Sequence, residues 1–509
     1  MKLTSLLENL KYEILQGTTD KSVTSLVYFS EDAVEESVFF AIAGAQRDGR
    51  EFCEDAIRLG SNTVVVQEPW SYRDPTVTVI LVEDARRAMA EMSKVFYGNP
   101  FERMLTIGIT GTKGKTSTTF FLRSILETAG IKTGIAGTVI NGCEGNFVEA
   151  SHTTPQSIDL YRLASEMVAK GCKAMVLEVS SQGLMHRRVE GIFFDVAVFT
   201  NLSPDHIGPG EHESFEDYAY WKSRLFLQCK KAIYRKEDPY WERLYQNVCE
   251  EKGVLDFDQP ITFGKSSDAD YFVHHIVSEK KHGKTRVRFR VGMRRYSLFI
   301  GGQFNALNGA AALAVAHYLG IKWKYIKKGL WNARIPGRLE PIETGTGCTV
   351  LVDYAHNGIA LETILKDLKR NQKGRLIVVF GCGGNRDRNR RFEMGRVAGR
   401  LADYSVITSD NPRRESPEQI IKDITSSMDE VGVEKENYIV IEDRRSAIGH
   451  ALQIADEQDT VLIAGKGHET YQLIGDCKLH FDDREVVRDF VASMDGTKRR
   501  GNREKRKMR

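Results

Sequence analysis

No apolar run in this sequence approaches the roughly 18 residues that a membrane-spanning helix needs. The first residues, from Met1 to Glu8, carry charge too early for the apolar core of a signal peptide. The eight cysteines are scattered and include no Cys-x-x-Cys pair, which argues against a disulfide framework and against a zinc site. We therefore expect a cytoplasmic protein with reduced thiols and no membrane span.

Charge is distributed unevenly. The net charge is +3, but residues 497–509 hold eight lysines and arginines against one glutamate, so the rest of the chain carries about −4. Such a tail could contact nucleic acid or anionic lipid. No aromatic residue is interleaved with the charge, which favours a disordered, solubilising tail over 496–509 and no nucleic-acid partner.

The length of 509 residues indicates about three domains. Short apolar runs alternate with helical patterns, which is typical of parallel sheets covered by helices, so the predicted fold class is α/β. Breaks at Gly98-Asn99-Pro100 and at Pro336-Gly337 divide the chain into the predicted domains 1–98, 99–333 and 334–495.

The expected elements of the first domain are strands at 25–28, 37–42, 63–66 and 78–82 and helices at 51–59 and 84–96. In the second domain we expect a helix at 116–129, strands at 174–179 and 195–200, a weakly β-patterned region at 260–302 and a helix at 305–319. The third domain shows the clearest alternation, with strands at 350–353, 376–380, 405–408 and 460–464 and helices at 361–370, 391–402, 417–431 and 444–457.

The most informative segment is a glycine-rich turn that follows an apolar strand pattern. It reads Gly-Thr-Lys-Gly-Lys-Thr from Gly111 to Thr116 and leads into a helical pattern. This order presents backbone N–H groups and a helix N-terminus to phosphate, with Lys115 as a point charge and Thr116 as a magnesium ligand. Ile109 stands where the full eight-residue motif has its first glycine, and the shorter form narrows the interpretation to a subset of ATP-binding proteins. A plain glycine turn is the alternative.

Polar side chains follow other predicted strands, and ligands of open α/β sheets bind beyond the carboxyl ends of strands. Glu178 interrupts an apolar run, where a carboxylate is costly unless it is paired or metal-bound. A solvated strand end is the alternative. His206 follows the next strand, and its position favours metal ligation over an ordinary core or surface histidine. Because magnesium accepts carboxylates together with phosphate oxygens, Glu178 and Thr116 predict one metal site.

Four residues have more than one interpretation on their own. Lys222 lies in a helical stretch and, from its neighbours alone, is predicted to be solvated. Asn305 and Asn308 lie one helical turn apart and could read a base edge, although the small residues after them suit close packing equally well. Arg338 follows the Pro-Gly hinge, from which an arginine could reach an ATP phosphate when domains close.

Three loops of the last predicted domain leave strand ends at Gly381, Ser409 and Gly465. They bring two arginines, an asparagine and a glutamate to one edge of the sheet. The arginines would suit a carboxylate and Glu469 an ammonium group, so a zwitterion is the expected ligand. Asn411-Pro412 is also a common turn, which leaves a purely structural role open.

Together these segments resemble the Mur ligase family, most closely its MurE type, over about residues 1–494. Ten motifs occur in the family's order, far more than chance allows: Gly-Thr-x-Gly-Lys-Thr, then His-Thr-Thr-Pro from His152, Glu-Val-Ser-Ser from Glu178, Asn-Leu-Ser-Pro-Asp-His from Asn201, Phe-Asn-x-x-Asn from Phe304, Pro-Gly-Arg from Pro336, Asp-Tyr-Ala-His-Asn from Asp353, Phe-Gly-Cys-Gly-Gly from Phe380, Asp-Asn-Pro-Arg from Asp410 and Gly-Lys-Gly-His-Glu from Gly465.

The resemblance implies a three-domain ligase of peptidoglycan synthesis that is expected to act as a monomer on small molecules. Its first domain would bind the UDP sugar, its central domain ATP and Mg²⁺, and its Rossmann-like last domain an amino acid. ATP would phosphorylate the D-glutamate carboxylate of UDP-N-acetylmuramoyl-L-alanyl-D-glutamate. The amine of an incoming amino acid would then displace phosphate from the acyl phosphate.

The family's functional residues fall on matching positions of this chain. The implied catalytic residues are Lys115, Glu178, His206, Lys222 and Arg338. The implied metal ligands are Thr116, Glu178, His206 and Lys222, the last as a carbamate formed from CO₂. ATP would be bound by Gly111, Thr112, Lys113, Gly114, Lys115, Thr116, Ser117, Asn305, Asn308, Arg338, Asp353 and His356. The UDP-muramoyl dipeptide would be bound by Ser30, Thr153, Thr154, Ser180 and Arg188. The incoming amino acid would be bound by Arg386, Asp410, Asn411, Pro412, Arg413, Gly465 and Glu469.

In this family the Asp-Asn-Pro-Arg motif accompanies meso-diaminopimelate. The distal carboxylate of diaminopimelate gives an arginine a bidentate partner that L-lysine lacks, and a buried arginine left unpaired should reject lysine. The chain departs from the family pattern at Phe29-Ser30-Glu31, where Asp-Ser-Arg is usual, and at His186, where glutamine is often found.

Three alternatives remain open. One is the same ligase with L-lysine or another amino acid as substrate. Another is a folylpolyglutamate synthase-like ligase, against which the first domain and the Asp-Asn-Pro-Arg motif argue. The third is a non-catalytic muropeptide-binding paralogue, which the retained Lys115, Glu178, His206 and Lys222 make a weaker hypothesis.

Overall fold

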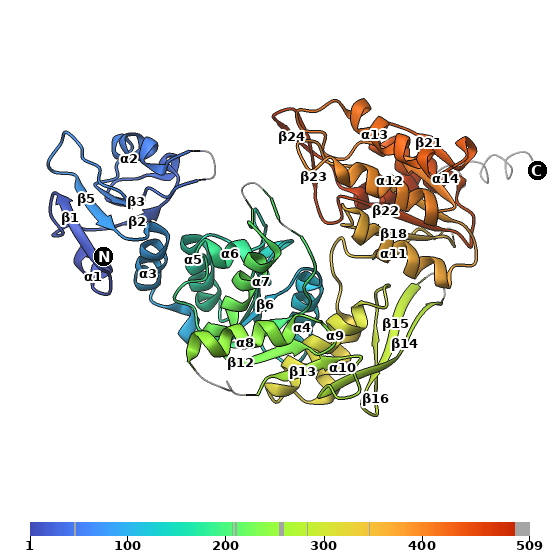
Figure 1. Cartoon of the computed structure of the whole chain (residues 1–509), viewed down its shortest axis with the longest axis horizontal. Coiled ribbons are helices and arrows are strands. Elements are labelled where there is room, and N and C mark those ends of the chain that lie inside the picture. Colours follow the sequence, from blue (N-terminus) through green and yellow to red (C-terminus); the bar gives the residue numbers. More distant parts are fainter. Residues whose placement is uncertain are drawn as a thin grey trace, which may run out of the picture. The chain divides into compact units, whose positions relative to one another are not determined.

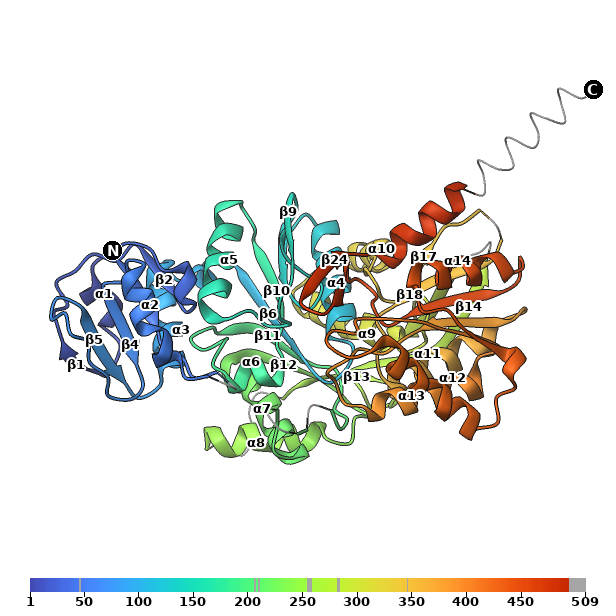
Figure 2. The same cartoon turned by 90° about the horizontal axis from the view of Figure 1, so that it is seen from above.

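Three main sheets, each mostly parallel and flanked by helices, organise the chain (Figures 1 and 2). The computed structural model describes residues 1–44, 47–205, 207–208, 211–253, 259–281, 284–345 and 347–493. These form two compact units, one of Met1–Phe272 with Ala310–Gly329 and the other of Val273–Gly309 with Leu330–Arg509. The α/β class predicted from the sequence is confirmed. The predicted tail over 496–509 lies outside the described residues.

The N-terminal sheet has the strand order β1-β5-β4-β3-β2, in which only β1 runs antiparallel to its neighbour. The strands are β1 Tyr12–Gln16, β2 Ser25–Val27, β3 Ser37–Phe40, β4 Thr63–Val66 and β5 Thr78–Val82. The helices are α1 Leu3–Leu7, α2 Cys53–Arg58 and α3 Ala85–Phe96, with short 3₁₀ turns at Ser30–Asp32, Gly49–Phe52 and Pro100–Arg103.

Both faces of this sheet are buried, which explains the unbroken apolar runs of its strands. Side chains alternate between two cores: Val38 and Val65 face one, and Phe39 and Val64 face the other. Asp84 begins α3 by accepting hydrogen bonds from the backbone N–H groups of Arg86 and Arg87. The four predicted strands are confirmed, whereas α1 and β1 were not predicted.

The central sheet lies mainly in the first unit, with the order β13-β12-β11-β6-β10-β7-β8-β9. The strands are β6 Leu105–Thr110, β7 Thr133–Ala136, β8 Ile140–Cys143, β9 Asn146–Glu149, β10 Ala174–Glu178, β11 Phe194–Phe199, β12 Cys229–Arg235 and β13 Ile261–Gly264. The helices are α4 Lys115–Thr128, α5 Ser157–Ala169, α6 Ser181–Met185, α7 Phe215–Ser223, α8 Trp241–Lys252, α9 Asn305–Tyr318 and α10 Trp323–Asn332, with a 3₁₀ turn at Arg224–Gln228.

Strands β6, β7, β10 and β11 are parallel and adjacent, so their carboxyl ends meet at one edge. The glycine-rich turn from Gly111 to Gly114, called the phosphate loop below, leaves this edge after β6, and Glu178 ends β10 at the same edge. The weakly β-patterned region contains, besides β13, three further strands: β14 Tyr271–Lys281, β15 Lys284–Val291 and β16 Arg294–Leu298. These three strands pair antiparallel in the order β14-β15-β16. Strands β15 and β16 lie in the second unit.

The C-terminal sheet belongs to the second unit and has the order β17-β18-β22-β19-β20-β21, with only β17 antiparallel. Its strands are β17 Glu340–Ile342, β18 Thr349–Asp353, β19 Leu376–Phe380, β20 Tyr404–Ile407, β21 Tyr438–Val440 and β22 Thr460–Ala464. A hairpin of β23 Tyr471–Ile474 and β24 Cys477–His480 follows. The helices, grouped around the sheet in Figure 1, are α11 Gly358–Asn371, α12 Asn389–Leu401, α13 Pro417–Glu430 and α14 Arg444–Ile454, with a 3₁₀ turn at Lys435–Asn437.

All four predicted strands and helices of the last domain are found within a few residues of their predicted ends. The domain boundaries at 98 and 333 stay predictions, because the division of the chain into two compact units does not coincide with either of them. Among the described residues, no helix combines the length and the apolarity that a membrane crossing requires.

A fully buried ion pair ties α14 to the C-terminal segment. Arg444 Nε and Nη2 each lie 2.8 Å from a carboxylate oxygen of Asp483, and both side chains are 0% exposed. Arg444 also donates to the carbonyl of Ala464, the last residue of β22. The pair therefore stabilises the strand end from which the loop at Gly465 departs.

We expect Arg444→Met to lower the stability of this unit by about 3–5 kcal/mol, because it leaves the Asp483 carboxylate buried and unpaired. Hydrogen exchange of the β22 amides would measure this as faster local opening. Arg445→Met is the matched control, since Arg445 pairs with Asp489 on the surface and its loss should cost less than about 1 kcal/mol. Equal exchange in the two variants would contradict the prediction.

Candidate functional site

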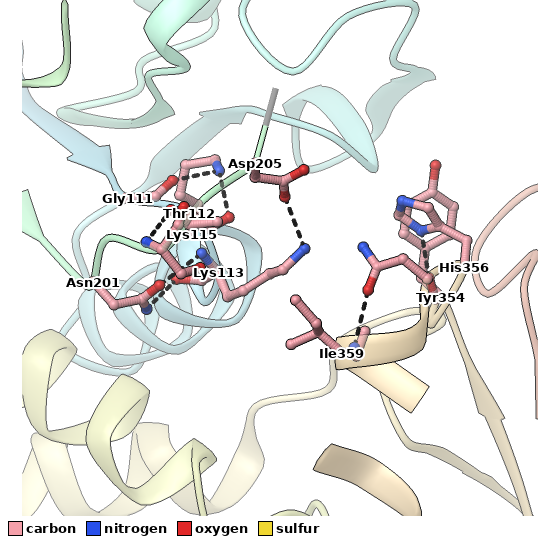
Figure 3. A network of polar contacts seen from close by, with 12 residues as sticks. Gly111, Thr112, Lys113, Lys115, Asn201, Asp205, Tyr354, His356 and Ile359 are labelled. Carbon is pink, nitrogen blue, oxygen red and sulfur yellow. Dashed lines mark hydrogen bonds and ion pairs between the residues drawn. The ribbon is translucent and has the colours of Figure 1, made fainter. Parts of the chain in front are cut away.

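The phosphate loop between β6 and α4 is held in shape by the segment that follows β11 (Figure 3). Asn201 accepts from the backbone N–H of Lys113 at 2.9 Å and donates to its carbonyl at 2.7 Å. Gly111 has φ +141°, and a Cβ there would lie 2.0 Å from Thr200 Oγ1, so only glycine fits. Gly114 is the N-cap of α4, again with positive φ, and Ser117 is buried in the first turn. The loop geometry is that of a phosphate-binding turn.

Two lysines project from this loop in different ways. Lys115 Nζ folds back onto the carbonyls of Gly111 and Thr112, at 2.8 and 3.3 Å (Figure 3). Lys113 is exposed and pairs with Asp205 at 3.1 Å. A phosphate that displaced the carbonyls would give Lys115 a stronger, charge-assisted partner.

The carboxylate of Glu178 is buried at the end of β10 and fully engaged. Oε2 accepts from Thr116 Oγ1 and from Thr138 Oγ1, both at 2.9 Å, and Oε1 accepts from the backbone N–H of Thr138 at 3.1 Å. Glu178 is 1% exposed, so the solvated strand end considered for it is wrong. The structure brings Thr116 and Glu178 together as predicted for one metal site. His206 lies outside the described residues, and the described residues contain no cluster of three metal-ligating side chains.

Lys222, on α7, is buried at 1% exposure, and its prediction as a solvated helix residue is wrong. Its Nζ donates to the carbonyl of Gly111 at 3.0 Å and lies 4.4 Å from the centre of the Tyr218 ring. Burial, and next the nearby charge of Lys115, lowers the pKa of Lys222 well below its ordinary value. Helical periodicity alone could not reveal this, because α7 packs on the phosphate loop through residues far away in the sequence.

Four of the five residues predicted to hold the UDP-muramoyl dipeptide form one hydrogen-bonded group. Thr154 Oγ1 lies 3.1 Å from Ser180 Oγ and donates to the Glu178 carbonyl, while Arg188 donates to the carbonyl of Thr154 at 2.9 Å. Thr153 joins through Thr138, with 3.2 Å between their hydroxyl oxygens. Ser30 is buried in the turn after β2, and among the described residues no hydrogen bond connects it to the other four.

A buried histidine that the sequence analysis did not single out lies beside this group. His212 is 0% exposed, with Nδ1 at 2.9 Å from Asp217 and Nε2 at 2.8 Å from Ser181 Oγ. It links α7 to the start of α6, next to Ser180. No pattern in the sequence distinguishes this histidine, because its partners lie 5 and 31 residues away in different elements.

In the second unit, the residues assigned to ATP form two small groups. Asn308 donates to Asn305 Oδ1 at 3.0 Å, and both side chains are buried. The Arg338 guanidinium lies 4.8 Å from the ring centre of Tyr354, and its Nε is buried without a hydrogen-bond partner. His356 Nδ1 lies 2.8 Å from the Tyr354 carbonyl oxygen (Figure 3).

Asp353 ends β18 and accepts from the backbone N–H groups of Leu339 and Ala355, both at 2.7 Å. Burial raises its pKa to about 6, against the opposing charge of Arg338. The carboxylate therefore organises the backbone that follows Arg338.

The three loops of the C-terminal sheet meet as predicted. Lys466, 0% exposed, donates to Asn411 Oδ1 and to Glu469 Oε2, both at 3.1 Å, and Asn411 Nδ2 donates to the same Glu469 oxygen at 2.9 Å. Gly465 has φ +115°, and a Cβ there would lie 2.4 Å from a carboxylate oxygen of Asp410. Burial raises the pKa of Glu469, with Lys466 opposing.

Two arginines stand beside this cluster. Arg413 holds a left-handed backbone, φ +54°, which costs about 1–2 kcal/mol for a residue with a Cβ. The β23–β24 hairpin fixes it, because Arg413 N–H donates to the Leu473 carbonyl and Gly475 N–H donates to the Arg413 carbonyl. Strained residues of this kind gather at functional sites. Pro412 is buried in the same turn.

The Arg413 guanidinium donates to the Gly384 carbonyl at 2.8 Å and, within the described part of the chain, has no carboxylate partner. Arg386 is exposed and close enough to act with burial in lowering the pKa of Arg413. An anion between the two guanidinium groups would relieve their repulsion.

Comparison with known proteins gives consistent matches. Residues 109–316 match the model of the Mur ligase middle domain, and residues 337–467 match that of the Mur ligase glutamate ligase domain. The UDP-N-acetylmuramoyl-L-alanyl-D-glutamate–2,6-diaminopimelate ligase of Caldanaerobacter subterraneus subsp. tengcongensis is 42% identical over 499 residues, which cover 97% of this chain and 99% of the relative.

Two solved structures bear on the alternatives. A structure with the same ligase name has a TM-score of 0.66 at 27% identity and covers 97% of this chain and 99% of its own. A Mycobacterium tuberculosis folylpolyglutamate synthase shares the fold with a TM-score of 0.57 at 17% identity, but it covers only 73% of this chain and 91% of its own.

The pKa of His186 predicts a pH dependence of stability. Burial, and then the charges of Arg86, Arg188 and His212, lower this pKa from 6.5 to about 4. The contribution to stability is therefore fully present above pH 6.5 and is lost as the pH falls toward 4, because the unfolded chain binds the proton first. His186→Gln should remove on the order of 1–3 kcal/mol of this dependence, measured by denaturant unfolding at a series of pH values.

His480→Gln is the control for this experiment, since the His480 side chain is 69% exposed and pairs with Glu485 on the surface. Its unfolding free energy should follow that of the wild type at each pH. Parallel curves for the wild type and His186→Gln would show the prediction to be wrong.

Proposed function

The chain belongs to the Mur ligase family, and we propose that it is the member that joins meso-diaminopimelate to UDP-N-acetylmuramoyl-L-alanyl-D-glutamate in peptidoglycan synthesis. It is an ATP-dependent ligase that forms an amide between an acid and an amino acid. The observation that supports the choice of amino acid is the strained Arg413, whose guanidinium has a carbonyl as its one hydrogen-bond partner among the described residues, beside the cluster around Glu469.

The reaction proceeds in two steps. An oxygen of the D-glutamate side-chain carboxylate attacks the terminal phosphorus of ATP, and ADP leaves. The amine of diaminopimelate then attacks the acyl carbon, loses a proton and expels phosphate, which leaves an amide. The phosphate loop would bind the nucleotide through its backbone N–H groups and Lys115, and would stabilise the charge that moves onto the leaving oxygen.

The oxygen donors at the end of β10 fit Mg²⁺. Thr116 Oγ1 and the Glu178 carboxylate already lie 2.9 Å apart, and a buried carboxylate beside a phosphate loop is the donor set that this ion takes. We assign Thr116, Glu178, His206 and Lys222 as its ligands. When bound, Mg²⁺ would neutralise phosphate charge.

Lys222 suits a carbamate because its surroundings do not suit an ammonium group. Among the described residues its Nζ has one hydrogen-bond partner, a carbonyl, and no carboxylate within ion-pair distance. In its neutral form, the Lys222 amine can add to CO₂ and lose a proton. A side chain that would be costly as a buried cation then becomes an anionic oxygen donor.

The remaining assignments follow from the family. Thr153, Thr154, Ser180, Arg188 and Ser30 would bind the UDP-muramoyl dipeptide, and Asn305, Asn308, Arg338, Asp353 and His356 would contact ATP. We propose that the protein is a monomer of the cytoplasm. Reduced thiols fit that compartment, and all eight cysteines, which lie in the described residues, are free.

In the amino-acid site, Glu469 would bind the ammonium of the substrate, while Arg413 and Arg386 would bind its distal carboxylate. L-Lysine offers a second ammonium where these arginines need an anion, so it would bring repulsion and leave the half-buried Arg413 guanidinium without an anionic partner. Folylpolyglutamate synthase-like activity is disfavoured, because that fold leaves about a quarter of this chain unmatched.

We expect the purified protein to release ADP from ATP only when both UDP-N-acetylmuramoyl-L-alanyl-D-glutamate and meso-diaminopimelate are present. A coupled ADP assay over a panel of amino acids would measure this. L-Lysine should be poorer by about 10⁴-fold in kcat/KM, the discrimination typical of a site with unpaired buried donors. Equal turnover with L-lysine would refute the specificity.

Arg413→Ala should raise the KM for diaminopimelate and narrow the preference over L-lysine, because the lost contact is made to bound substrate. Arg414→Ala is the matched control: Arg414 pairs with Asp476 on the surface and should leave both constants near the wild-type values.

Lys222→Ala should lower kcat by at least about 10²-fold, the scale of losing one group that stabilises transferring charge. Acetate or formate should restore part of the activity by supplying the missing carboxylate, measured in the same ADP assay. Lys230→Ala, which removes an exposed lysine paired with Asp195, should show neither effect. Full activity of Lys222→Ala without added carboxylate would rule out the carbamate.

A further inference from the structure

Arg86 and Arg188, from different parts of the first unit, are near enough for the charge of one to act on the other. Arg86 is in the first turn of α3, and Arg188 follows α6; α3 also packs on α5 (Figure 1). Asp84 connects the two segments: one carboxylate oxygen accepts from the backbone N–H of Arg86, and the other lies 3.2 Å from Arg187 Nε. Arg187, which precedes Arg188, is therefore held by Asp84, two residues before Arg86.

Within the part of the chain that the structure describes, each arginine has a buried N–H donor without a hydrogen-bond partner. Arg86 donates through Nη2 to the Ala43 carbonyl at 2.9 Å, but its Nη1 is buried without a partner. Arg188 donates through Nη1 to the Thr154 carbonyl at 2.9 Å, and its Nε is likewise buried without a partner. A buried N–H without a partner costs about 1–3 kcal/mol, so two on neighbouring cations need an explanation.

No anion of the described chain supplies that partner. Asp84, whose charge acts on Arg86, is engaged by backbone N–H groups and by Arg187, and it forms no ion pair with Arg86 or Arg188. Burial and the charge of Arg86 lower the pKa of Arg188 to about 10. Burial, and then the charges of Arg86 and Arg188, lower the pKa of His186 to about 4. The carboxylates Asp84 and Glu190 thus pair with Arg187 and Arg87, and among the described residues neither Arg86 nor Arg188 has an ion-pair partner.

We propose that Arg86 acts together with Arg188 as a binding site for an oxyanion of the substrate. The inference rests on the proposed function in one respect: Arg188 belongs to the residues assigned there to the UDP-muramoyl dipeptide, whereas Arg86 was assigned to nothing. Two sources share the required chemistry, namely the diphosphate of the nucleotide and a carboxylate of the peptide. Guanidinium N–H groups bind both in a forked geometry.

The test compares Arg86→Gln with Arg87→Gln. Both variants lose one positive charge from the same helical turn. Arg87 differs from Arg86 in being exposed and in having a carboxylate partner, with Arg87 Nε 3.7 Å from Glu190 Oε1. Calorimetry should show Arg86→Gln binding UDP-N-acetylmuramoyl-L-alanyl-D-glutamate at least about tenfold more weakly, while Arg87→Gln binds as the wild type does. Equal affinity of Arg86→Gln and the wild type would overturn the proposal.

Thermal melting separates binding from a structural role. A site that awaits an anion carries repulsion when empty, so the free Arg86→Gln protein should melt at or above the wild-type temperature and gain less from substrate. If Arg86 only supported the Ala43 carbonyl, the free variant would melt lower and its affinity would be unchanged. Should Arg86→Gln fail to fold, Arg86→Lys carries the same test, because it keeps the charge but lacks the fork of donors.

UDP as a second probe distinguishes the two sources. If Arg86→Gln weakens UDP as much as the full substrate, the diphosphate is bound there; if only the full substrate is weakened, a peptide carboxylate is bound. Inorganic pyrophosphate keeps the inference separate from the proposed function. If the wild type binds no UDP-muramoyl dipeptide, the proposed function fails. The oxyanion site is still supported in that case if the wild type binds pyrophosphate and Arg86→Gln does not. It is refuted if neither protein binds pyrophosphate or if both bind it equally.

Discussion

The hydrogen bond between Thr116 and Glu178 is the contact on which the central site depends. It joins the first turn of α4 to the last residue of β10, at 2.9 Å and out of contact with solvent. Because β6, β10 and β7 are parallel neighbours, the phosphate loop, Glu178 and Thr138 arrive at one edge without any special loop. The buried carboxylate is tolerated because it accepts three hydrogen bonds from two threonines, namely from both hydroxyl groups and from the backbone N–H of Thr138. The same polar surroundings are what a phosphate and its counter-ion require.

The C-terminal unit applies the same rule with different supports. The ends of β18, β19, β20 and β22 bring their loops together, but the side chains there are charged rather than hydroxylic. Lys466 donates to the Glu469 carboxylate and balances its charge. The hairpin after β22 holds the backbone of Arg413 in the left-handed conformation, which is unfavourable for a residue with a Cβ. The buried Arg444–Asp483 pair anchors the strand from which one of these loops begins.

Much of this could be predicted from the sequence, and particular residues show why. The phosphate loop, the strands of the C-terminal sheet and the meeting of Asn411 with Glu469 follow from local patterns, since apolar runs and glycine turns report on their own neighbourhood. The fate of Lys222 does not: its helix has weak periodicity, and its burial depends on Gly111, 111 residues earlier. His212 and Arg86 escaped notice for the same reason, because what distinguishes them is a contact between distant elements. α1 and β1 were missed because they are short and draw their stability from the sheet they pack on.

The hairpin of β23 and β24 has a consequence for how this chain could change its choice of amino acid. Asn411 Oδ1 is shared by Lys466 and the backbone N–H of Leu473, and Arg413 borrows its backbone geometry from the residues on either side of Ile474. The selectivity that we propose would thus depend on the hairpin and the turn together rather than on one side chain. If Arg413 were exchanged for another residue, the hairpin would still fix the backbone at this position and so the direction of the new side chain. A change of substrate would therefore require the hairpin and the turn to be redesigned together.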